Sequence, residues 1–86
     1  MEMIEDLVKI AIKKINSFNE DRYYIRKGNE EEPPIIYKKL NDGIETVYED
    51  ISTITTITVT SNTIMLYDEG SITIISPSNY TYHGLL

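Results

Sequence analysis

The sequence has no cysteine, no tryptophan and a single histidine, His83. Without cysteine, the chain cannot form disulfides or thiolate zinc sites. With one histidine, it has neither a histidine-rich metal site nor a His–His acid–base pair. Its four glycines are isolated from one another, so no glycine-rich loop is present to bind a phosphate. The sequence therefore predicts no cofactor and no standard nucleotide site.

Long apolar runs are also absent, because no segment approaches the roughly 20 apolar residues that a membrane-spanning helix needs. The first residues, Met1 to Asp6, are acidic, whereas a signal peptide begins with basic residues. We therefore expect no membrane association. The expected location is the cytoplasm, or the host-cell cytoplasm if the protein is viral.

Residues that could carry catalysis are few. His83 stands three residues from the C-terminus, where side chains are usually solvated, and no serine lies in a nucleophile-elbow motif. The adjacent carboxylates Glu49 and Asp50, and likewise Asp68 and Glu69, could converge on a cation at a turn. Neither pair is followed by the further ligands of an EF-hand. We expect no catalytic residues, no metal ligands and no enzymatic activity.

The length of 86 residues predicts one domain, spanning residues 1–86. A chain of this size buries only about 60–65% of the surface of its unfolded form, which leaves little room for a deep pocket. That limit favours a binding surface over a self-contained enzyme. Small domains without disulfides or metals often gain stability by self-association, so we also expect a homo-oligomer.

The net charge is −6. A negative chain is repelled by nucleic acid and by anionic lipid, since both are polyanions. The charge does permit binding to a protein that has a basic surface. We therefore expect a protein partner and no direct contact with nucleic acid.

The N-terminal segment has the pattern of an amphipathic helix over about residues 2–18. Apolar residues recur at spacings of three and four, and they are Ile4, Leu7, Val8, Ala11, Ile12, Ile15 and Phe18. Acidic residues come first in this segment and Lys13 and Lys14 come late, which suits the helix dipole.

The remainder, about residues 22–82, has the pattern of an antiparallel sheet. Asn41-Asp42-Gly43 is a strong hairpin signal, and the β-branched run from Thr53 to Thr60 favours strand. A last short strand, Tyr80 to Tyr82, precedes an end expected to fray. The sequence thus predicts an α+β fold, in which one helix packs on a meander of five to six strands.

A two-residue turn at Ser61-Asn62 would place Val59 opposite Ile64 and Ile57 opposite Leu66. Those four residues then form a core face. Met65 and Tyr67 point to the other face, where Ile72 or Ile74 can join them. The sheet would therefore be apolar on both sides, and one helix can cover only one of them.

In a meander, the start of the helix and the loops after alternate strands share one end. Ten of the fourteen carboxylates then gather there: Glu2, Glu5, Asp6, Glu30, Glu31, Glu32, Glu49, Asp50, Asp68 and Glu69. Such an end could steer a basic partner towards the protein. The alternative is that acidic residues simply prefer solvated loops.

The preferred hypothesis is a small, acidic, non-enzymatic interaction module. One concrete form is an inhibitor of the phage or virus type that engages a basic nucleic-acid-binding partner. The expected partner-binding residues are Glu30, Glu31, Glu32, Glu49, Asp50, Asp68, Glu69, Met65, Tyr67 and Ile74. A first alternative is a small-molecule-binding homo-oligomer with a pocket of tyrosine and threonine between subunits. A second alternative is a divalent-cation-dependent enzyme at the acidic end.

Overall fold

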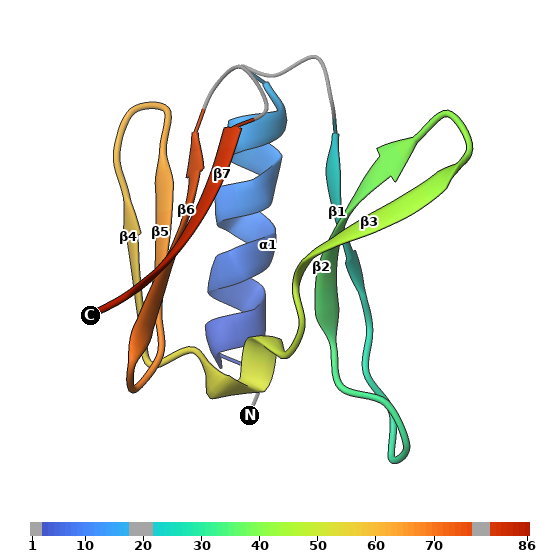
Figure 1. Cartoon of the computed structure of the whole chain (residues 1–86), viewed down its shortest axis with the longest axis horizontal. Helices are drawn as coiled ribbons and strands as arrows, with labels where there is room; N and C mark the ends of the chain where they lie inside the picture. The colour runs from blue at the N-terminus through green and yellow to red at the C-terminus, as the bar shows by residue number, and fades with distance from the viewer. Residues whose placement is uncertain (1–2, 18–21, 77–79) are drawn as a thin grey trace.

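The computed structural model describes residues 3–17, 22–76 and 80–86. Over these residues the chain forms an α-helix, a short 3₁₀ helix and seven strands in two antiparallel sheets (Figure 1). The α+β class predicted from the sequence is confirmed. The single meander is wrong, because the strands divide into a sheet of three and a sheet of four.

The helix α1 spans Met3–Asn16 and follows the predicted apolar stripe, with Val8, Ala11, Ile12 and Ile15 buried. The predicted limits, residues 2 and 18, lie outside the described residues. Asn16 joins the end of the helix to the first strand. Its side-chain amide donates to the carbonyl of Tyr23 at 2.9 Å and its side-chain oxygen accepts the N–H of Tyr23 at 2.8 Å.

The first sheet contains β1 (Tyr23–Arg26), β2 (Ile35–Leu40) and β3 (Gly43–Tyr48) in that order. The predicted hairpin is present, with Leu40 opposite Gly43 across the turn. Gly43 has a φ of 155°, a backbone conformation that favours glycine because it has no Cβ.

The second sheet contains β4 (Thr56–Val59), β5 (Ile64–Tyr67), β6 (Ser71–Ser76) and β7 (Tyr80–Leu85), also in sequence order. The predicted pairing is confirmed, since Val59 is opposite Ile64 and Ile57 is opposite Leu66. The expectation of a frayed end is wrong, because β7 continues to Leu85 and pairs with β6 along its whole length.

The chain leaves the first sheet between β3 and β4. A 3₁₀ helix, η1 (Ile51–Thr53), ends at the first residue of the segment predicted as strand, and β4 begins only at Thr56. The Asp50 side chain accepts the N–H of Ser52 at 3.0 Å and so caps η1. Ile51 is fully buried, and its N–H donates to the carbonyl of Pro34 at 2.9 Å. The Asp50 cap and the hydrogen bond from Ile51 to Pro34 direct the chain away from β3. As a result, β4 pairs with β5 and not with β3.

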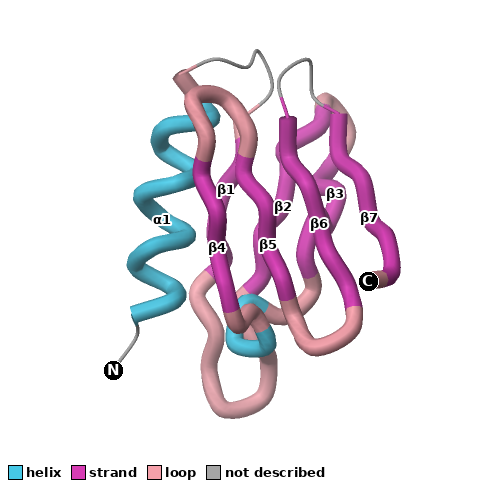
Figure 2. Tube along the Cα trace, turned by 90° about the vertical axis from the view of Figure 1, so that its left-hand side faces the viewer, coloured by secondary structure: helices cyan, strands magenta, loops and turns pink. Residues whose placement is uncertain are grey.

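The core lies between the inner faces of the two sheets and α1. Ile36 comes from the first sheet, and Ile64, Leu66 and Ile75 come from the second. The helix contacts β1, β4, β5 and η1, and it closes one side of the space between the sheets (Figure 2). The opposite side is bordered by β3 and β7, and neither described helix covers it (Figures 1 and 2).

Ile36 is 0% exposed at the centre of this core. The variant Ile36→Ala should lower the free energy of unfolding by about 2–5 kcal/mol, because it removes buried methyl groups and leaves a cavity. Ile44→Ala on β3 is a matched control, since Ile44 is 56% exposed, and it should change that energy by less than about 0.5 kcal/mol. Urea unfolding measures both, and equal losses would contradict the placement of Ile36 in the core.

Candidate interaction surfaces

Acidic residues from three loops lie at the same end of the fold as the start of α1 (Figure 1). The loops join β1 to β2, β3 to η1, and β5 to β6. We call this region the acidic end, and its described residues are Glu5, Asp6, Glu30, Glu31, Glu32, Glu49, Asp50, Asp68 and Glu69. Glu2 was expected here and lies outside the described residues. These loops lie together although the strands form two sheets, because each β-hairpin returns the chain to the end of the fold where α1 begins.

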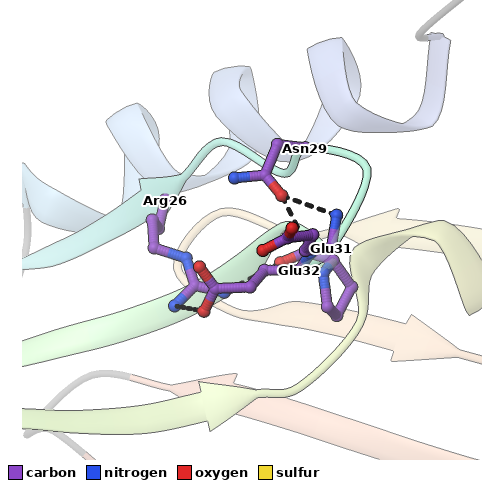
Figure 3. A network of polar contacts seen from close by, with 5 residues as sticks. Arg26, Asn29, Glu31 and Glu32 are labelled. Carbon is purple, nitrogen blue, oxygen red and sulfur yellow. Dashed lines mark hydrogen bonds and ion pairs between the residues drawn. The ribbon is translucent and has the colours of Figure 1, made fainter.

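The loop between β1 and β2 is held by Asn29 and Arg26 (Figure 3). The side-chain oxygen of Asn29 accepts the backbone N–H of Glu31 at 2.8 Å and that of Glu32 at 2.9 Å. Arg26 lies 3.5 Å from the Glu32 carboxylate and donates to the carbonyl of Pro33 at 3.0 Å. The loop is therefore ordered by its own side chains, and one of its three carboxylates is paired.

Asp68 joins the two sheets. One of its carboxylate oxygens accepts the backbone N–H groups of Gly70 and Ser71 and the Ser71 hydroxyl, and the other accepts the Tyr48 hydroxyl at 2.9 Å. The hydrogen bond from the Ser71 hydroxyl, followed by that from Tyr48, lowers the pKa of Asp68 below its ordinary value. Burial is the main cause that raises the pKa of Tyr48, and the Asp68 carboxylate adds to it.

The expected acidic site residues thus differ in their surroundings. Asp50 and Asp68 hold backbone N–H groups, and Glu32 pairs with Arg26. Among the expected acidic site residues, four are exposed and have no cationic partner in the described part of the chain: Glu30, Glu31, Glu49 and Glu69. Glu5 is buried, and its Oε1 has no hydrogen-bond partner.

The apolar residues predicted for the second surface lie on the outer face of the four-stranded sheet. Met65 is opposite Ile74, and Tyr67 is opposite Ile72. The strand register extends this face over all four strands, and we call it the neutral face: Thr56, Thr58, Met65, Tyr67, Ile72, Ile74, Tyr80 and Tyr82. None of its strands contains Asp, Glu, Lys or Arg. Figure 2 shows no other described element over it.

Unlike the neutral face, the outer face of the three-stranded sheet carries a charged side chain, that of Lys39. Tyr24 and Tyr37 stack there, with ring centroids 5.5 Å apart. The ammonium of Lys39 lies 6.0 Å from the Tyr24 ring. The uncharged surface is therefore confined to the β4–β7 sheet.

A groove follows the open side between β3 and β7. Its larger part, about 470 Å³, is lined by Tyr48, Thr53, Thr73 and His83, together with Asp68 and other residues of this region. A second part of about 280 Å³ continues between β3 and Tyr80, Thr81 and His83 of β7. This groove lies within one chain, whereas the pocket expected from the sequence lies between subunits.

The sequence analysis expects His83 in a solvated C-terminal tail, whereas the structure places it on a paired strand. The residue lies on β7, and its Nδ1 is 3.0 Å from the Oγ1 of Thr73, which is buried. The contact follows from the register of β6 with β7, in which Thr73 is opposite His83. The sequence pattern does not determine this register, so no local pattern could have shown the contact.

Among the described residues, no three His, Asp or Glu side chains are grouped so that they could hold a metal ion. No described helix is long and apolar enough to cross a membrane. Searches against models of protein families, curated proteins and solved structures find no match for this chain.

The lowered pKa of Asp68 predicts a pH effect on stability. A carboxylate whose pKa is lower in the folded state stabilises the fold above its unfolded pKa, and this contribution is lost as the pH falls through the folded pKa. Asp68→Asn should therefore be less stable than the natural protein at pH 7, with a difference that shrinks below about pH 4, where Asp68 ordinarily titrates at 3.8.

Urea unfolding at pH 7, 5 and 3 measures that difference. Asp42→Asn, in the β2–β3 turn, is the control, because Asp42 is exposed and no hydrogen bond or ion pair is found for its side chain within the described structure. A constant difference between Asp68→Asn and the natural protein over this range would contradict the prediction.

Proposed function

We propose that this chain is a non-enzymatic interaction module whose acidic end binds a basic surface of a partner protein. The observation that carries the proposal is that four exposed loop carboxylates of the acidic end, Glu30, Glu31, Glu49 and Glu69, have no cationic partner among the described residues. They come from three loops that are distant in sequence and lie at one end (Figure 1).

Order in these loops supports the proposal. The side chains of Asn29, Asp50 and Asp68 each accept backbone N–H groups within their own loop. A surface that is already ordered loses less conformational entropy when it binds. The carboxylates can then present a fixed pattern of charge to cationic side chains, which gives specificity and speeds association.

A basic nucleic-acid-binding site is one partner of this kind, because such a site is built to attract phosphates. An inhibitor of the phage or virus type would bind there and exclude the nucleic acid. The net charge of −6 suits this role.

Charge reversal at the acidic end tests the proposal. The double variant Glu31→Lys, Glu69→Lys should bind an immobilised lysine-rich peptide at low salt about tenfold more weakly than the natural protein, since each exposed ion pair contributes up to about 1 kcal/mol. Asp42→Lys, Glu45→Lys changes the net charge equally but lies on the β2–β3 hairpin at the opposite end.

The hairpin variant should retain most of the binding, and circular dichroism checks that both variants are folded. A natural partner captured from cells should show the same order of affinities. Equal losses in the two variants would contradict the proposal, because only net charge would then matter.

A second candidate function is the binding of a small polar molecule in the groove between β3 and β7. The volume of about 470 Å³ lies within the usual range for ligand sites, about 300–1,000 Å³. The hydroxyl groups of Tyr48, Thr53 and Thr73 and the imidazole of His83 supply hydrogen-bonding groups there.

A thermal-shift screen with a panel of small polar metabolites tests this candidate, since a ligand that binds only the folded state raises the Tm. A true ligand should raise the Tm of the natural protein and lose most of that effect in His83→Ala. An equal shift in both proteins, or no shift with any compound, would argue against a ligand at this groove.

A further inference from the structure

The two sheets have four edge strands, and three of these are protected against pairing with another chain. β1 and β4 lie beside α1. β3 carries Glu45, which pairs with Lys38 at 3.3 Å, and its register with β2 shifts between Ile36 and Tyr37. A charge and a bulge are the usual means by which proteins protect an edge.

The fourth edge strand, β7, has none of these protections. Its six residues, Tyr80–Leu85, include no charged residue and no proline. Leu85 is 89% exposed and Tyr80 is 60% exposed. Figure 2 shows no described element beyond this edge of the sheet. An uncharged edge strand of this length is a template for pairing with another strand.

The backbone of β7 is positioned for such pairing. The N–H of Leu86 donates to the carbonyl of Gly70 at 3.0 Å, towards β6. Because hydrogen-bonding direction alternates along an antiparallel pair, the backbone groups of Gly84 and Tyr82 also face β6. Those of Thr81, His83 and Leu85 face away from the sheet.

The absence of charge at this edge permits a second copy of the chain to approach it. The strands β4–β7 carry no Asp, Glu, Lys or Arg, so two copies can approach here although each has a net charge of −6. A two-fold antiparallel arrangement also turns one copy upside down relative to the other. The two acidic ends then point in opposite directions, separated by more than the screening distance of about 8 Å at physiological salt.

We propose that β7 pairs antiparallel with β7 of a second copy of this chain, which joins the two four-stranded sheets into one eight-stranded sheet. The two-fold axis passes near His83, so His83 lies beside its counterpart and Thr81 lies opposite Leu85 of the second copy. The arrangement is closed, because both copies use the same edge strand and no β7 edge remains for a third copy.

The pairing also joins the two neutral faces into one continuous surface. The proposal does not depend on what the acidic end binds.

Sedimentation velocity over a range of concentrations tests the dimer. The natural protein should form dimers as its concentration rises. His83→Lys and His83→Glu should each remain monomeric, because like charges meet at the axis. An equal mixture of the two variants should recover dimers, which a merely misfolded variant would not do. A natural protein that stays monomeric at millimolar concentration, or mixed variants that stay monomeric, would overturn the proposal.

Cysteine cross-linking tests the register, since the natural chain has no cysteine. Facing residues of a hydrogen-bonded antiparallel pair have Cα atoms about 5.5 Å apart, a distance that a disulfide can span. His83→Cys should therefore form a covalent dimer under mild oxidation. Thr58→Cys, on β4 at the other edge of the same sheet, should not. Equal cross-linking of both variants would overturn pairing through β7.

Discussion

The fold depends on the turn that carries the chain from β3 to β4. Ile51 is fully buried there, and its N–H bonds to the carbonyl of Pro34 at 2.9 Å. Asp50 caps the 3₁₀ helix that follows. The turn also brings Tyr48, at the end of β3, within 2.9 Å of Asp68 in the other sheet. The seven residues between β3 and β4, 49–55, thus separate the two sheets and hold them face to face.

Most local elements could be predicted from the sequence because short-range patterns determine them. The apolar spacing of α1, the Asn41-Asp42-Gly43 hairpin and the pairing of Val59 with Ile64 all depend on residues close in the chain. The division into two sheets could not be predicted. It depends on Ile51 reaching Pro34, and no pattern around Ile51 marks a partner so far away in the sequence.

The same limit applies to the candidate surfaces. Alternation along β5 and β6 was enough to place Met65, Tyr67 and Ile74 on one face. Which carboxylates are unpaired could not be read from the sequence, because Asp50 and Asp68 bind backbone groups while Glu49 and Glu69 stand beside them in solvent. Neighbouring acids of the same chemical type therefore have different roles, one structural and one available to a partner.

Charge is segregated in this fold. Most of the described carboxylates are in loops, whereas the strands of the second sheet carry no charge. Like charges at the acidic ends repel one another, whereas strands β4–β7 contribute no charge of their own. The proposed pairing through β7 would therefore join two copies without bringing their acidic ends together.

In both sheets each strand pairs with its neighbour in sequence. Such contacts close short loops, and proteins rich in local contacts fold quickly. Each sheet can therefore form from its own hairpins before the two meet. The contact between Ile51 and Pro34 and the docking of α1 onto β4 and β5 join distant segments, so we expect them to form last.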